Sequence, residues 1–158
     1  MQAQMTKPLD ILQFMFGGNA TFTLVSVKTG ARYTYKIRHC DSYNPRYARK
    51  GNVMSFVSVM TGSDNEANYS YLGLFRVCEG YSHGAKSKIA EAAPCSQAFA
   101  WFYKLIYSTP VLEADALPAS VEFWHEGKCG RCGRKLTVPE SIARGIGPEC
   151  ATRICEAA

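Results

Sequence analysis

The sequence predicts an α+β protein, in which an antiparallel β-sheet of two hairpins is covered by one helix and followed by a small cysteine-containing module. Three patterns support this prediction. Two pairs of alternating segments lie before residue 78, an apolar stripe of helical spacing lies near residue 100, and three closely spaced cysteines lie after residue 128. A length of 158 residues suits one domain with an appendage, so we expect a domain over 1–107, a linker over 108–120 and the module over 121–158.

The predicted sheet consists of two hairpins. Residues 20–27 and 32–38 both alternate between apolar and polar side chains, and a short segment containing Gly30 joins them. Residues 54–60 are rich in Val, Phe and Met, and residues 68–77 return along them after a polar loop. The four segments therefore predict four antiparallel strands.

One helix is predicted over residues 95–107, where Pro94 suits the first turn. Apolar side chains recur there at spacings of three and four, which predicts a broad apolar face that packs on the sheet. The core that we expect contains Tyr33, Tyr35, Ile37, Phe56, Phe99 and Phe102. Residues 108–120 contain two prolines and no periodicity, which is typical of a linker.

Three cysteines near the C-terminus have the spacing of a metal site. Cys129 and Cys132 flank two residues, glycine follows each of them, and seventeen residues separate this pair from Cys150. Such a turn aims both sulfurs at one centre, and the glycines let backbone N–H groups reach the thiolates. Pro148 suits the first turn of a helix that would carry Cys150. A knuckle, a hairpin and a ligand on a helix together predict a treble-clef-like finger that binds Zn²⁺.

A single helical turn is expected between the knuckle and Cys150. Thr137 and Glu140 fit a capping box, and Gly145 fits a left-handed helix end, so the turn is predicted over 141–144. A redox Cys-x-x-Cys pair is the alternative interpretation of the knuckle. It requires a strand before and a helix after the motif, whereas a polar hairpin follows here.

Two residues compete for the fourth metal position. His125 lies four residues before the knuckle at the end of a strand-like run, and Cys155 lies five residues after Cys150. Ligands on one helix share a face best when they are three or four residues apart, because a spacing of five rotates them by roughly 140°. We therefore expect His125 as the fourth ligand and keep Cys155 as the alternative.

The segment CGRCGRKLTVPESIARGIGPEC, from Cys129 to Cys150, resembles a small zinc-binding family of unknown function that recurs in phage and mobile-element proteins. The resemblance covers about 30 of the 158 residues and rests on the Leu-Thr, Pro-Glu-Ser-Ile and Gly-Ile-Gly-Pro-x-Cys elements. It implies a metal-binding module in a virus-type gene. It implies no reaction, because the family has no assigned activity.

The charge pattern indicates an anionic partner. The net charge is +5, and basic side chains cluster between residues 28 and 50 and again between 128 and 153. The candidate contact residues are Arg32, Lys36, Arg38, Arg46, Arg49, Lys50, Arg131 and Arg134, with Tyr43 and Tyr47 as stacking surfaces. We expect a nucleic-acid-binding protein. The alternatives are a phage-encoded inhibitor that contacts a host defence complex, such as a CRISPR effector, and a plain structural component of a larger assembly.

Other classes have no motif in this chain. A phosphate loop, a nucleophile elbow and an HExxH helix are all missing from the sequence, so we do not expect an enzyme. No apolar run approaches the roughly 18 residues that span a bilayer, and the N-terminus does not have the pattern of a signal peptide. We therefore expect a cytoplasmic protein that does not enter the membrane.

Overall fold

The computed structural model describes all residues except 1, 40–53, 64–66, 77–78 and 158. Its described part contains a seven-stranded antiparallel sheet and five short helices. The elements in chain order are β1 (Ala3–Met5), α1 (Pro8–Met15), β2 (Asn19–Ser26), β3 (Arg32–His39), β4 (Met54–Met60), β5 (Tyr69–Arg76), β6 (Gly80–His83), α2 (Pro94–Ile106), α3 (Thr109–Ala114), β7 (Val121–His125), α4 (Pro139–Arg144) and α5 (Pro148–Ala157).

The strands follow the order β1-β7-β2-β3-β4-β5-β6. The two predicted hairpins are confirmed as β2–β3 and β4–β5, and the predicted helix is confirmed as α2. Strand β7 was expected to begin a separate module at residue 121. The structure instead inserts it between β1 and β2, with Phe123 opposite both Met5 and Leu24. The sheet therefore continues across the expected domain boundary.

Two helices had not been expected. Helix α1 begins at Pro8 and buries Ile11, Phe14 and Met15, which lie at the spacing of one helical face. Helix α3 lies inside the stretch 108–120, which the sequence had indicated to be a plain linker. Its single buried residue is Val111, so the apolar signal of this short helix is weak.

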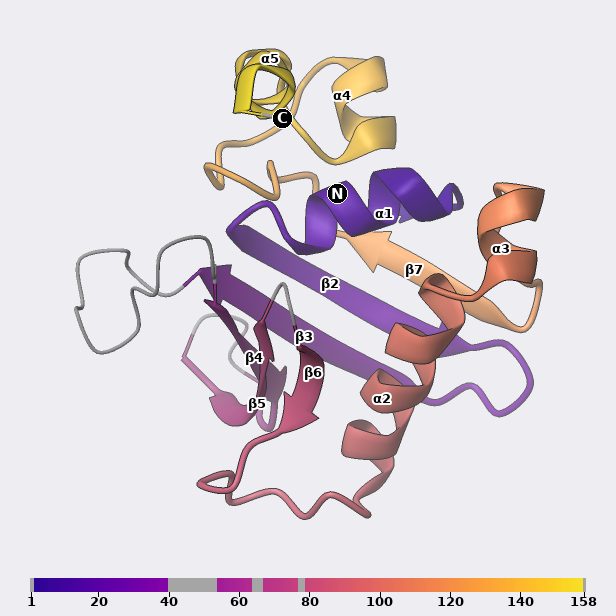
Figure 1. Ribbon diagram of the computed structural model, residues 1–158, viewed down its shortest axis with the longest axis vertical. Helices are drawn as coiled ribbons and strands as arrows, with labels where there is room; N and C mark the ends of the chain where they lie inside the picture. Colours follow the sequence, from indigo (N-terminus) through magenta and orange to yellow (C-terminus); the bar gives the residue numbers. More distant parts are fainter. Residues whose placement is uncertain (1, 40–53, 64–66, 77–78, 158) are drawn as a thin grey trace.

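The main core lies between the sheet and the helices α1 and α2. Figure 1 shows α1, α2 and α3 on one side of the sheet, with α4 and α5 beyond α1. Tyr35, Ile37, Phe99 and Phe102 are all fully buried there, as predicted, and Tyr33 packs against the same core while half-buried.

The expectation that Phe56 belongs to this core is wrong. Val57 and Val59 face the core. Phe56 and Ser58 alternate with them along the strand and therefore point to the opposite face. Phe56 is half-buried there and lies opposite Arg38 in the register. Strand β4 is apolar on both faces, so alternation alone did not select the buried one.

We call this opposite side of the sheet the open face. Its side chains alternate with those of the core along each strand. It carries Thr21, Thr23, Arg32, Thr34, Lys36, Arg38, Phe56, Ser58, Met60, Tyr69, Tyr71, Glu122 and Trp124. Most of these side chains are half-exposed, whereas the alternate residues are buried.

Candidate metal centre

The three predicted cysteine ligands come together. The sulfurs of Cys129, Cys132 and Cys150 all lie within 4.8 Å of one another. Cys129 and Cys150 are buried, and Cys132 is exposed at the surface. Three thiols at these separations can bind one metal ion without large movements.

Local backbone signals build this geometry. After the knuckle, the chain turns at Gly133, which has a positive φ of 76°. The N–H of Cys129 then donates to the carbonyl of Arg134 at 2.8 Å, and a β-bridge joins Lys128 to Lys135. These contacts form the short hairpin that the sequence predicts.

The following helices place the third sulfur. Helix α4 ends at Gly145, whose φ of 73° is left-handed as expected, and α5 begins at Pro148 with Cys150 in its first turn. The predicted capping box is not formed, because Val138 occupies the N-cap position without a side-chain hydrogen bond. The turn is therefore stabilised at its C-terminal end rather than by Thr137.

Backbone N–H groups surround the Cys129 sulfur. Gly147 donates to it at 3.4 Å and Arg131 at 3.5 Å. Burial alone would raise the pKa of Cys129, but hydrogen bonds from Gly147, Cys132 and Arg131 together lower it to about 7. Burial and the neighbouring sulfurs raise the pKa of Cys150 to about 11. A bound divalent cation would keep all three groups as thiolates.

The core of this region is small. Cys129, Leu136, Ile146 and Cys150 form the buried cluster, and Ile142 packs against it. So few apolar side chains bury too little surface to hold a stretch of this length folded by themselves.

The structure does not bring His125 to the cysteines. His125 is buried, with 1% of its surface exposed, and both ring nitrogens meet backbone groups. Nε2 lies 2.7 Å from the carbonyl oxygen of Ile142, and Nδ1 accepts the N–H of Gly127 at 3.0 Å. Nε2 therefore carries the proton, and burial lowers the pKa of the ring. His125 thus ties the end of β7 to α4. The side chain of Cys155 lies outside the described residues.

Glycines let the metal region, which is the segment from Gly127 to α5, dock closely against helix α1 and the start of β2. A Cβ added at Gly130 or at Gly145 would come within 2.6 Å of the Phe14 ring. The carbonyl of Gly130 also accepts the N–H of Asn19, at 2.7 Å. The sequence did not predict that Phe14 and Asn19 would contact this region. The local signal of the contact was the pair of glycines, one in the knuckle and one at the end of α4.

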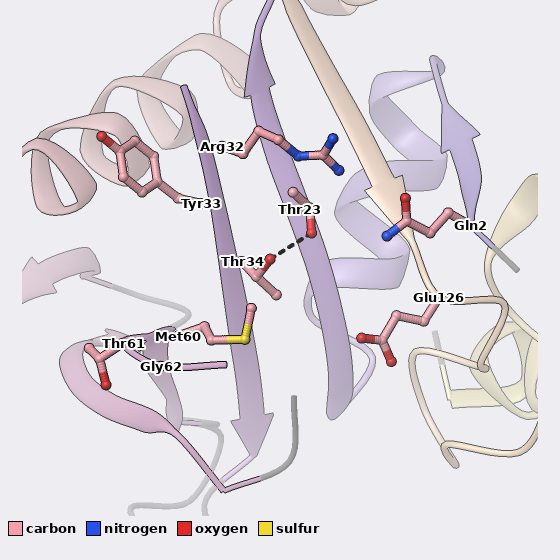
Figure 2. A pocket seen from close by; sticks show the side chains of 9 residues that line it. All are labelled: Gln2, Thr23, Arg32, Tyr33, Thr34, Met60, Thr61, Gly62 and Glu126. Carbon is pink, nitrogen blue, oxygen red and sulfur yellow. Dashed lines mark hydrogen bonds between the residues drawn. The ribbon is translucent and has the colours of Figure 1, made fainter. Parts of the chain in front are cut away.

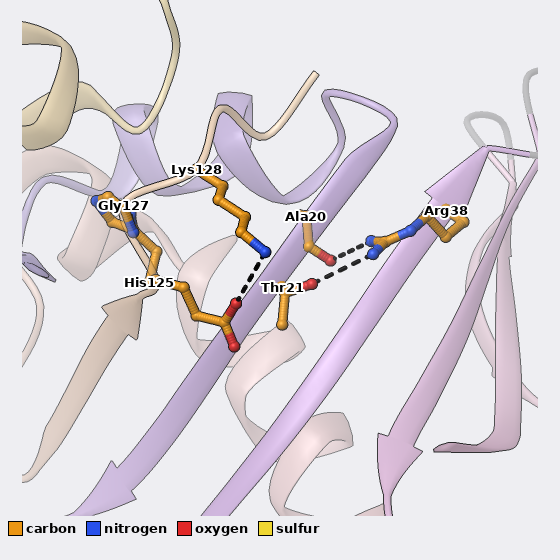
Figure 3. Close-up of polar contacts among 7 residues, drawn as sticks. Ala20, Thr21, Arg38, His125, Gly127 and Lys128 are labelled. Carbon is orange, nitrogen blue, oxygen red and sulfur yellow. Dashed lines mark hydrogen bonds and ion pairs between the residues drawn. The ribbon is translucent and has the colours of Figure 1, made fainter. Parts of the chain in front are cut away.

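The basic residues predicted on β3 do lie on the open face. The guanidinium of Arg38 donates to the Ala20 carbonyl at 2.7 Å and to the Thr21 hydroxyl at 3.3 Å, as Figure 3 shows. Lys36 places its ammonium 4.0 Å from the centre of the Tyr69 ring, and Arg32 is exposed. Arg38 is thus held against the sheet, Lys36 lies over an aromatic ring, and Arg32 is exposed.

Of the remaining predicted contact residues, the structure describes only Arg131 and Arg134. The Arg131 guanidinium donates to the Cys150 carbonyl at 3.3 Å, and the Arg134 side chain is exposed. The other predicted residues, which are Tyr43, Arg46, Tyr47, Arg49 and Lys50, lie outside the described part of the chain. Glu126 was not predicted as a site residue, but it lies beside the open face and approaches Lys128 at 3.9 Å.

The cysteine region is the part of the chain that matches a known family. Residues 121–154 match DUF6011, a family of unknown function. The DUF6011 segment contains β7, the three-cysteine cluster and α4. No curated protein and no solved structure matches the chain. Within the described residues, no helix is both long and apolar enough to cross a membrane.

Proposed function

We propose that the DUF6011 segment is a treble-clef-like finger that binds Zn²⁺ as a structural ion. Thiolates favour Zn²⁺, and structural zinc sites are closed by four protein ligands. The described residues supply three sulfurs, and Cys155 on α5 is the nearest further cysteine in the sequence. The role of the proposed ion is structural, because it holds α4 and α5 against the knuckle.

We further propose that the protein is not an enzyme and that its open face binds single-stranded nucleic acid. The observation that carries this proposal is the combination of Lys36 over the Tyr69 ring with further half-exposed aromatic side chains on the same face. Those aromatic residues are Phe56, Tyr71 and Trp124. Sheet faces that combine stacking surfaces with cations are a common way to bind unpaired bases.

The spacing of the cations on β3 also fits a strand. Arg32 and Lys36 are four residues apart, which corresponds to about 13 Å along a β-strand. Two cations at this separation can contact two phosphates of an extended strand while the aromatic rings contact the bases. The net charge of +5 favours association with such a polyanion.

The test is the salt dependence of binding to a labelled single strand. Reversing both cations in Arg32→Glu/Lys36→Glu should weaken binding about tenfold at low salt and reduce the slope of log K against log salt by about 1.4. The matched control Lys28→Glu/Lys104→Glu makes the same change in net charge at two exposed lysines away from the open face, one at the hairpin turn and one on α2, and should lose much less affinity than the open-face variant.

A spectroscopic measurement locates the contact. The chain has two tryptophans, so Trp101→Phe leaves Trp124 on the open face as the only indole. A bound strand should quench its fluorescence. The nucleic-acid proposal fails if the parent binds no strand at about 50 mM salt, or if the control loses as much affinity as the open-face variant. A host defence complex that this face contacts through protein would then be the partner to seek.

A further inference from the structure

The open face also contains a cavity, and the phosphate contacts proposed above do not explain what it binds. It has a volume of about 570 Å³ and lies among β2, β3, the end of β4 and the segments that flank β1 and β7. This size falls within the range of about 300–1,000 Å³ that is typical of small-ligand pockets. Figure 2 shows its polar side chains arranged around a central pair, Thr23 and Thr34.

The cavity is lined by one cationic side chain, Arg32, and one anionic side chain, Glu126. The two threonine hydroxyls bond each other at 2.7 Å, and Arg32, Gln2 and Glu126 surround them. Among the described residues, no ion pair engages the Arg32 guanidinium, and Glu126 has a long contact of 3.9 Å to Lys128 and weaker electrostatic interactions with Arg38 and Tyr69. A guanidinium with five donors and a carboxylate with two acceptor oxygens are thus both available to a ligand.

The carboxylate determines what kind of group can enter. Glu126 would repel a phosphate, so the strand must present something other than its backbone to this carboxylate, while Arg32 still faces a neighbouring phosphate. A planar base satisfies the cavity better, because the Met60 side chain supplies an apolar surface beside the polar groups. The ligand must also offer donors to Glu126 and acceptors to Arg32.

We propose that this cavity binds a guanine base of the single strand, an inference that rests on the function proposed above. Guanine has two adjacent donors, N1–H and the N2 amino group, which match the two oxygens of a carboxylate such as Glu126. Its O6 and N7 are both acceptors, which match the fork of a guanidinium such as Arg32. Adenine, cytosine and thymine each place an acceptor beside the donor on the same edge, so a carboxylate meets repulsion there.

The experiment compares ten-nucleotide thymidine strands that carry one central dG, dA, dC or inosine. With the zinc-loaded full chain, we expect the dG strand to bind about tenfold more tightly than the all-thymidine strand. Inosine lacks the N2 amino group and should lose most of this gain. A strand-borne guanine should also bind much more tightly than free guanosine monophosphate, since the phosphates of its neighbours add contacts.

Two variants assign the preference to the cavity. Glu126→Gln should abolish the preference for dG while the all-thymidine strand binds as before or better. Arg32→Lys keeps the charge but removes the guanidinium fork, so it should reduce the preference and leave the salt slope unchanged. The control Glu113→Gln alters an exposed carboxylate on α3 and should behave as the parent does.

The outcomes separate this inference from the proposed function. If all strands bind within about twofold of one another, or if Glu126→Gln keeps the dG preference, the guanine site is rejected and the nucleic-acid proposal stands. If free guanosine monophosphate binds as tightly as the dG strand, the cavity is a nucleotide site and the strand-borne assignment is rejected. If no strand binds, both proposals fail together.

Discussion

His125 illustrates how one side chain can have the right type and position for a metal ligand and still serve another role. Its ring lies under α4, tilted against Phe14 with 5.3 Å between the ring centres. Nε2–H donates to the Ile142 carbonyl and the Nδ1 lone pair accepts the N–H of Gly127, so no ring lone pair is left for a metal. The sequence signal, a histidine just before a knuckle, is the same for a ligand and for such a structural bond.

The variant His125→Phe tests this role. It preserves the ring but leaves the Ile142 carbonyl and the Gly127 N–H without partners. We expect the free energy of unfolding to fall by about 2–6 kcal/mol, because each of the two buried groups that lose a partner costs about 1–3 kcal/mol. The folded protein should still contain one zinc per chain by elemental analysis. Cys132→Ser is the comparison and should release the metal. Loss of zinc from His125→Phe at a stability like that of the parent would restore His125 as a ligand.

At the scale of the elements, short-range sequence patterns predicted the strands, helices and turns that depend mainly on neighbouring residues. Residues 32–38 alternate strictly between apolar and polar side chains, so β3 and its buried face were predicted correctly. The apolar stripe predicted α2 and the burial of Phe102, but Trp101, which belongs to the same stripe, is 50% exposed. The cysteine spacing predicted the cluster because its turns are short and rich in glycine. The insertion of β7 beside β2 depends on contacts about 100 residues apart, as between Phe22 and His125, and no local pattern indicates it.

Helix α1 and the cavity on the open face were also not predicted from the sequence, for similar physical reasons. Helix α1 has only eight residues, which is short for a periodic signal, and it is stabilised by burying Phe14 against β7 and the metal segment. The cavity with Arg32 and Glu126 joins segments that are far apart in the chain. Its residue types are ordinary for a surface, so the sequence offers no signal for it.

Neighbouring residues of α2 provide a test of how this helix packs. Phe102 is fully buried and stacks on Phe123 with 5.7 Å between ring centres, whereas Trp101 is 50% exposed. Phe102→Ala should lower the free energy of unfolding by about 3–5 kcal/mol, the usual cost of emptying a buried aromatic site. Trp101→Ala on the same helix should cost less than about 1 kcal/mol. Urea unfolding measures both, and similar values for the two variants would contradict the packing described here.

At the scale of the whole molecule, one continuous sheet supports two regions that are held together by different means. The sheet buries a large aromatic core, in which the rings of Phe22 and Phe123 stack at 4.7 Å. The metal region has only a small apolar cluster around Leu136 and Ile146. Strand β7 belongs to the first region even though it lies within the DUF6011 segment. The physical boundary is therefore expected after His125, rather than before Val121.

Removal of the metal should reveal this boundary by hydrogen exchange. After chelation, the amides of Leu136, Gly145 and Ala151 should lose protection, because their bonds to Gly127, Ser141 and Gly147 lie in the segment that the proposed ion would hold folded. The amides of β3 and those of β2 after Asn19 should remain protected, since their ladder and core do not contact the cysteines.

The Asn19 amide, which donates to Gly130, reports on the contact between the two regions, and it should exchange faster after chelation. Cys132→Ser should give the same pattern without chelator, which controls for effects of the chelator itself. Two results would contradict this account. One is equal loss of protection in β2 and β3, which would mean that the sheet depends on the metal. The other is full protection around Leu136 in protein shown to be free of zinc, which would mean that the small apolar cluster suffices to hold the segment folded.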